Sequence, residues 1–163
     1  ILSYNRKTYG AEEWEELYNY PDLGYSFIYQ NGNNSTLGDN YGLYAHYNFY
    51  FFKRNVQFRV GQGVSYASNP YDKETNFRNN AYGSDILSST YLMFNYHKEN
   101  IFKGLGFKAG ASIIHYSNAN FRAPNTSTNT LAFNAGFVYD LDGGKKKSNR
   151  AITLQLCVKN RNK

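Results

Sequence analysis

The sequence predicts an all-β protein, an antiparallel eight-stranded transmembrane β-barrel that is incomplete at its N-terminus in this chain. Three observations predict it: apolar residues alternate with small or polar ones, the alternating stretches are long, and aromatic residues gather near their ends. The 163 residues include 17 Tyr and 12 Phe, and only 18% are charged. This composition excludes a coiled coil and a charge-rich disordered tail. The sequence also lacks the run of ~18 apolar residues that is typical of a transmembrane helix.

A side-chain period of two is clearest in residues 56–67. Val56, Phe58 and Val60 fall on one face of this stretch, whereas Gln57 and Arg59 fall on the other. This period is that of a β-strand, in which successive side chains point to opposite faces. The same pattern predicts further strands at 25–30, 41–52, 86–97, 101–118, 130–141 and 151–158, and the end of another at 1–4.

Two kinds of protein show this alternation. A soluble sheet hides its apolar face in a core, whereas a transmembrane barrel turns that face to lipid and keeps the polar one inside. The predicted strands reach about 10–13 residues, near the ~9–11 that span a bilayer and longer than the ~5–6 usual in globular proteins. Their polar faces carry Gly, Ser, Asn and Gln rather than the Lys and Glu of soluble surfaces. These features favour the membrane barrel.

Aromatic residues near the strand ends are typical of the interfacial girdles of membrane barrels. We therefore expect the surplus of Tyr and Phe to face lipid rather than to form a core. The residues concerned are Tyr47, Tyr50, Phe51, Phe52, Tyr91, Phe94 and Tyr96.

The predicted connections alternate in length. Outer-membrane barrels have long extracellular loops and short periplasmic turns, and this sequence fits that pattern. Residues 5–20, in which Trp14 is surrounded by acidic residues, predict a longer connection with helical character on the periplasmic side. The short turns are expected at 53–55 and 98–100, and the long polar loops at 31–40, 68–84 and 119–129.

The stretch 101–118 carries the candidate chemistry. Its apolar face includes Phe107 and Ile113, and two further steps of two residues reach His115 and Ser117. An ionisable side chain is costly on a lipid-facing surface, so it marks a candidate functional site. Residues i and i+2 of a strand lie roughly 6.6 Å apart, and a His base with a Ser nucleophile is the minimal pair for acyl transfer. The alternative is that both residues simply solvate the end of a strand.

A short motif adds a family resemblance. The run His115-Tyr116-Ser117-Asn118-Ala119, followed by Pro124-Asn125 and an alternating last strand, resembles the signature of the PagL-type lipid A 3-O-deacylases. These are outer-membrane acyl-ester hydrolases of Gram-negative bacteria, and the resemblance is most specific over residues 113–139.

The resemblance implies a role for each motif residue. Ser117 matches the nucleophile, His115 the general base, and Asn118 with the backbone amides after it the oxyanion-binding element. It also implies a site facing the outer leaflet of the cell outer membrane, lipid A of lipopolysaccharide as the partner, and no metal or cofactor.

One departure concerns the third catalytic position. Where the family has a Glu, this chain has Asn129. An Asn can hold a His in the right tautomer, as in Cys-His-Asn proteases, but without stabilising the imidazolium. The other interpretations are an impaired enzyme, or an acid supplied by Asp72, Glu74 or Asp85. We favour Asn129 as the residue that orients His115.

The resemblance also fixes the strand count. With His115 on the seventh strand and residues 130–141 as the eighth, residues 1–4 form the end of the second, and the first is missing. We therefore expect residues 1–142 to form the barrel and residues 143–163 to begin a C-terminal extension that contains the stretch 151–158.

Other candidate sites have simpler interpretations. Cys157 is expected to be a small apolar residue, and His46 and His97 are expected in the interior or in turns rather than as metal ligands. Asp72 and Glu74, with Lys73 between them, could meet phosphate or divalent ions but fit a solvated loop better. The net charge of +6 is scattered except at 145–147, so attraction to anionic lipid fits it, and nucleic acid is not expected as a partner.

The sequence thus predicts an outer-membrane hydrolase that removes an ester-linked acyl chain from lipid A. The main alternative is a non-catalytic barrel of structural or adhesive type. A soluble ligand-binding barrel is a further alternative, and a porin is disfavoured because about eight strands leave a packed interior.

Overall fold

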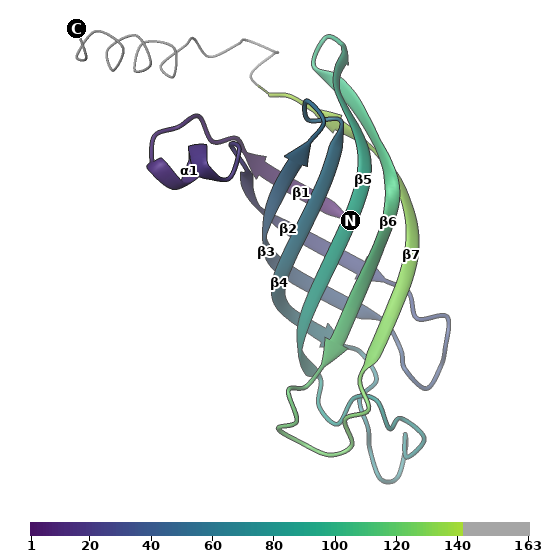
Figure 1. The fold of residues 1–163 in the computed structure, drawn as a ribbon. Coiled ribbons are helices and arrows are strands. Elements are labelled where there is room, and N and C mark those ends of the chain that lie inside the picture. Colours follow the sequence, from purple (N-terminus) through teal and green to yellow (C-terminus); the bar gives the residue numbers. More distant parts are fainter. Residues whose placement is uncertain (142–163) are drawn as a thin grey trace, which may run out of the picture.

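The computed structural model describes residues 1–141, so the expected extension 143–163, with its stretch 151–158 and Cys157, lies outside the described residues. Within them the chain forms one antiparallel sheet and a short helix (Figure 1). No helix in residues 1–141 is long and apolar enough to cross a membrane. The elements are β1 (Leu2–Arg6), α1 (Glu13–Leu17), β2 (Asp22–Gln30), β3 (Asn40–Phe51), β4 (Val56–Ala67), β5 (Ile86–Phe102), β6 (Leu105–Ser117) and β7 (Thr128–Tyr139).

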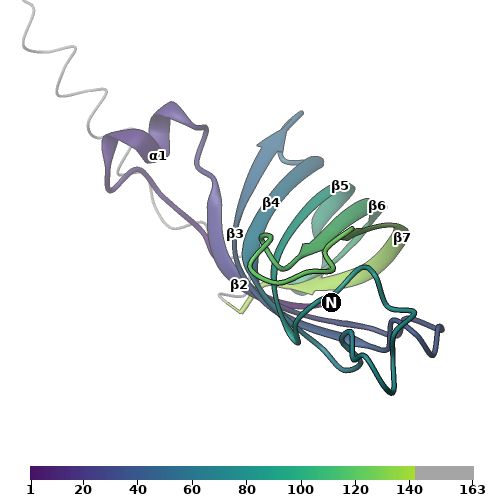
Figure 2. The same cartoon turned by 90° about the horizontal axis from the view of Figure 1, so that it is seen from below.

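The seven strands of the described residues are hydrogen bonded in chain order, from β1 to β7. Every neighbouring pair is antiparallel. Seen along its axis, the sheet curls into a half-barrel whose two edges are β1 and β7 (Figure 2). The predicted all-β antiparallel class is confirmed, and this half-barrel is consistent with an incomplete β-barrel.

The connections alternate as predicted. Long loops join the strands at one end of the sheet, and tight turns join them at the other (Figure 1). The predicted helical connection is present as α1, although residues 5 and 6 belong to β1.

The turn predicted at 98–100 was wrong. β5 continues to Phe102, and the chain turns at Lys103 and Gly104, which have positive φ values of 45° and 87°. Gly adopts this left-handed backbone without strain, and Asn100 Oδ1 accepts a hydrogen bond from the Gly104 amide at 2.9 Å. The chain therefore turns at Gly104, which adopts the left-handed backbone readily, rather than at the polar residues 98–100.

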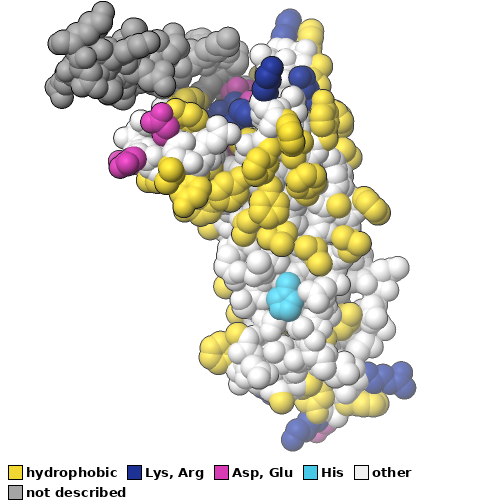
Figure 3. All heavy atoms as spheres, viewed as in Figure 1, with side chains coloured by type: hydrophobic (Ala, Val, Ile, Leu, Met, Phe, Trp, Pro, Cys, Tyr) yellow, Lys and Arg dark blue, Asp and Glu magenta, His cyan; other side chains and the backbone are white. Residues whose placement is uncertain are grey.

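The two faces of the sheet differ as the alternation predicted. On β3, Tyr41, Leu43 and Tyr47 are exposed on the convex side, whereas His46 and Asn48 are buried in the interior. Figure 3 shows hydrophobic side chains gathered over the upper part of one outer face, with uncharged polar groups and a histidine below them. The outer face is thus mainly apolar, whereas the interior combines polar side chains with a buried apolar cluster that includes Ile28, Leu87 and Met93.

The expected outward position of Tyr was only partly right. Phe residues of the described chain avoid the buried core, but Tyr50 and Tyr91 lie in the interior with 3% and 0% exposure. The Tyr91 hydroxyl is 2.8 Å from Ser26 Oγ, and the Tyr50 hydroxyl donates to Asp22 at 2.7 Å. Tyr suits a polar interior because its ring packs while its hydroxyl finds a partner, whereas Phe has no such group.

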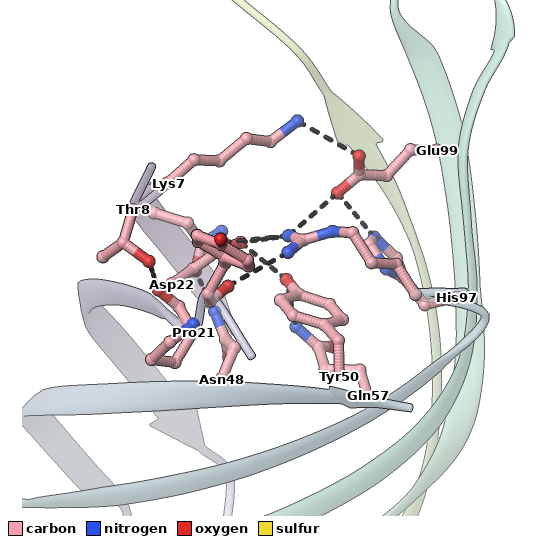
Figure 4. Close-up of polar contacts among 12 residues, drawn as sticks. Lys7, Thr8, Pro21, Asp22, Asn48, Tyr50, Gln57, His97 and Glu99 are labelled. Carbon is pink, nitrogen blue, oxygen red and sulfur yellow. Dashed lines mark hydrogen bonds and ion pairs between the residues drawn. The ribbon is translucent and has the colours of Figure 1, made fainter. Parts of the chain in front are cut away.

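A charged network lies in the interior at the turn end of the sheet (Figure 4). Arg54 binds Asp22 at 2.9 Å, and Lys7 binds Glu99 at 3.1 Å. Arg54 also lies 3.6 Å from Glu99, so one connected set of charges ties the start of β2 to the end of β5. His97, predicted in the interior or a turn, is buried beside this network at 2% exposure.

Candidate active site

β6 delivers His115 and Ser117 to the outer face of the sheet, next to its long-loop end. Both side chains are half-buried, whereas Ile114 and Tyr116 between them point inward with 4% and 0% exposure. The period-two argument therefore placed His115 and Ser117 on the correct face.

His115 is held by Asn129 of the neighbouring strand. The two residues are direct cross-strand partners of β6 and β7, and His115 Nδ1 lies 2.9 Å from Asn129 Oδ1. Because an amide oxygen only accepts hydrogen bonds, Nδ1 carries the proton in this contact. The lone pair then lies on Nε2, which is the nitrogen that a general base would use.

Ser117 is held by the loop after β6. Its Oγ lies 3.1 Å from Asn125 Nδ2 and 3.2 Å from the backbone nitrogen of Ala119. The orientation of the Asn125 amide is fixed from its other side, because its Oδ1 accepts a hydrogen bond from the Asn118 backbone at 3.1 Å. Two N–H donors therefore converge on Ser117 Oγ. In the described part of the chain, no hydrogen bond joins Ser117 to the ring of His115.

The side chain of Asn118 is used differently from the expectation. It is buried at 3% exposure, donates to the Arg122 carbonyl at 2.6 Å and accepts from the Asn120 backbone at 3.0 Å. These bonds close the loop on itself, so the structure brings the side-chain amide of Asn125, rather than that of Asn118, to Ser117. Sequence reasoning quoted Pro124-Asn125 only as part of a motif and assigned Asn125 no role.

Two of the acidic residues considered as substitutes for the missing Glu, Asp72 and Asp85, are engaged in local contacts. Asp72 accepts hydrogen bonds from the backbone and hydroxyl of Thr75 at 2.8 and 2.9 Å, and these bonds lower the pKa of its carboxyl. Asp85 accepts a bond from the adjacent Ile86 amide at 3.0 Å. Asn129 is the group that contacts His115 Nδ1.

The other histidine that sequence analysis singled out, His46, is enclosed in the interior at 2% exposure. Its position agrees with the expected interior placement. Among residues 1–141, no group of His, Cys, Asp and Glu side chains is arranged to hold a metal ion.

Comparison with known proteins decides the family. The family model described as "Lipid A 3-O-deacylase (PagL)" matches residues 1–138, a range that includes His115, Ser117, Asn125 and Asn129. The chain belongs to the lipid A 3-O-deacylase family. Neither the search of curated proteins nor that of solved structures found a match. Lipid A 3-O-deacylases are ester hydrolases, so the resemblance seen in the motif around His115 is confirmed at the level of the family.

Proposed function

We propose that this chain is an outer-membrane enzyme that removes an ester-linked acyl chain at the 3-O position of lipid A, using Ser117 as nucleophile and His115 as general base. One observation carries the proposal. Within the part of the chain that matches lipid A 3-O-deacylases, His115 and Ser117 share the outward face of β6, and each is oriented by an Asn of the neighbouring strand or loop.

The outward apolar face supports a location in the membrane. Leu43 and Phe94 are 63% and 58% exposed on the outer face of β3 and β5, whose buried inward residues include His46 and Asn95. Exposing such a surface to water is unfavourable, whereas lipid acyl chains solvate it. A substrate that lies in the outer leaflet would then meet Ser117 from the lipid side, without entering the interior.

The first half of the reaction forms an acyl-enzyme. Ser117 Oγ attacks the ester carbonyl carbon while its proton passes to His115 Nε2. The carbonyl oxygen becomes an oxyanion, and we assign its stabilisation to the N–H groups of Asn125 and Ala119, which bind the adjacent Ser117 Oγ in the resting structure. The C–O bond to the sugar then breaks, and the leaving sugar oxygen takes the proton from His115.

The second half returns the enzyme to its starting state. A water molecule gives a proton to His115 and attacks the acyl carbon. The bond from the acyl carbon to Ser117 Oγ then breaks, Ser117 Oγ takes the proton from His115, and the fatty acid is released. Asn129 holds the ring in one tautomer throughout, but as a neutral group it adds no charge to stabilise the imidazolium. We therefore expect a working but slow enzyme.

Mass spectrometry of lipid A from Gram-negative cells that express the chain tests this proposal. Wild type is expected to produce lipid A lighter by one ester-linked acyl chain, and Ser117→Ala is expected to leave lipid A intact. Ser112→Ala is the matched control, because Ser112 lies on the same strand but faces the interior at 4% exposure. Identical acylation with all three chains would contradict the proposed activity and favour a structural barrel.

A further inference from the structure

A row of polar side chains crosses the outward face of the sheet from β4 to β7. Gln62 pairs with Thr90, Thr90 with His115, and His115 with Asn129, so these four residues are successive cross-strand neighbours. Ser88 lies beside this row as the direct partner of Ser117. Directly paired residues have Cβ atoms about 4.5–5.5 Å apart on a shared face. Thr90 and Ser88 therefore flank His115 and Ser117 on the side opposite Asn129.

Gln62, Ser88 and Thr90 are joined into one cluster. The Thr90 hydroxyl donates a short hydrogen bond to Gln62 Oε1, and Gln62 Nε2 donates to Ser88 Oγ at 3.2 Å. Gln62 and Ser88 are exposed and Thr90 is half-buried. None of these three residues has a role in the reaction proposed above.

The cluster lies among exposed apolar residues of the outer face, with Ile86 at 59% exposure next to Ser88 on β5. Leu92 and Phe94, the next outward residues of β5 beyond Thr90, are 38% and 58% exposed. Polar side chains on a lipid-facing surface are costly, and their mutual hydrogen bonds offset only part of that cost. A ligand that supplies the remaining hydrogen bonds would offset more of it.

The hydrogen-bonding groups of the cluster define what it can bind. Gln62 Nε2 carries a second proton, and the Ser88 hydroxyl can donate as well as accept. The cluster contains amide and hydroxyl groups and no charged side chain. Phosphate is recognised mainly by Arg and Lys. Neutral groups that donate and accept hydrogen bonds, such as amides and hydroxyls, fit this cluster better.

We propose that Gln62, Ser88 and Thr90 form a subsite for the amide and hydroxyl groups that neighbour the scissile ester on an acylated sugar. This inference rests on the proposed function, because it places the ester carbonyl at Ser117. Ser88 is the cross-strand neighbour of Ser117, and the Cβ atoms of such partners lie about 5 Å apart, so a sugar on this side of the ester meets the cluster. The subsite selects glycolipids over phospholipids, which lack these neutral groups beside the ester.

Lipid binding to the full chain in detergent tests the subsite separately from catalysis. All proteins carry Ser117→Ala, so that bound lipid is not hydrolysed. The two probes are an acylated N-acylglucosamine and phosphatidylglycerol with acyl chains of the same length, titrated by native mass spectrometry. We expect Gln62→Leu, Thr90→Val and Ser88→Ala each to raise the Kd of the glycolipid about three- to ten-fold, as expected for one lost hydrogen bond. The Kd of the phospholipid should change much less.

Leu92→Met is the matched control, because Leu92 is the next outward residue of β5 after Thr90 and lies outside the cluster. It should leave both dissociation constants unchanged. An unchanged glycolipid Kd in the three variants, or equal losses for both lipids, would overturn the subsite. If the subsite discriminates but the chain with Ser117 intact releases no fatty acid, the hydrolase proposal fails and the subsite stands. If the chain with Ser117 intact releases fatty acid but the three variants do not discriminate between the two lipids, the hydrolase proposal stands and the subsite is rejected.

Discussion

Residues 1–141 contain two Ser–His pairs of interest, and the pair that is joined by a hydrogen bond is the one that cannot act as an active site. In the interior, Ser26 Oγ lies 2.8 Å from His46 Nδ1. The other ring nitrogen of His46 is 2.8 Å from Asn5 Oδ1, and Ser26 is also bound to the Tyr91 hydroxyl at 2.8 Å. Both Ser26 and His46 are 2% exposed, so this pair is satisfied by the protein and closed to a substrate.

The outer pair has the opposite properties. His115 and Ser117 are half-buried on the outer surface, and each is held by a different Asn. The contact with Asn129 leaves His115 Nε2 with an unshared lone pair. A reactive Ser–His pair thus needs a serine oxygen and a histidine nitrogen that are free to react, and a surface that substrate can reach. The hydrogen bond between Ser26 and His46 provides neither.

Removing the outer histidine should have the largest effect. We expect His115→Ala to reduce the rate of fatty-acid release from lipid A about 10³–10⁴-fold, because Ser117 then lacks its general base. The fold should be retained, since the side chain of His115 is half-buried and bound to Asn129 alone. The measurement is the initial rate in detergent, with heat-modifiable migration as the check of folding.

The inner histidine provides the control for this prediction. His46→Ala should keep the rate per folded molecule, while the free energy of unfolding falls by about 1–3 kcal/mol because Ser26 and Asn5 lose their buried partner. A large loss of activity in His46→Ala together with full activity in His115→Ala would show that the inner pair, and not the outer pair, is the active site.

Removing the donor to Ser117 should have the next largest effect. Asn125→Ala is expected to lower kcat about 10²–10³-fold with a smaller change in KM, because its N–H group is positioned to stabilise the oxyanion. Asn125→Asp, which keeps the shape but removes the donor, should behave similarly. Asn120→Ala, in the same loop, should leave kcat unchanged, and equal losses in the Asn120 and Asn125 variants would contradict the role of Asn125.

The smallest expected effect concerns the residue that orients His115. Asn129→Ala should lower kcat about ten-fold because the ring loses its partner, whereas Asn129→Glu should raise kcat because a carboxylate stabilises the imidazolium. Steady-state kinetics on purified lipid A measure both. An unchanged rate in both variants would reject the role of Asn129.

The sequence predicted the features that depend on strand period. The outward positions of His115 and Ser117 follow from alternation along one strand, which the structure confirms. The contact between Asn125 and Ser117 depends instead on the path of the loop after β6. A loop has no regular alternation of side chains from which this contact could be predicted. The burial of Tyr91 was missed for a related reason, because aromatic residues occur on both faces and only the structure shows that its hydroxyl meets Ser26.

Covalent labelling with a lipid-like fluorophosphonate tests most directly which serine is the nucleophile. The folded chain is treated in detergent and digested, and the adduct is located by peptide mass spectrometry. We expect an adduct on Ser117 that is lost in His115→Ala and kept in His46→Ala. An adduct on Ser26, or equal labelling of Ser117 in wild type and His115→Ala, would contradict it.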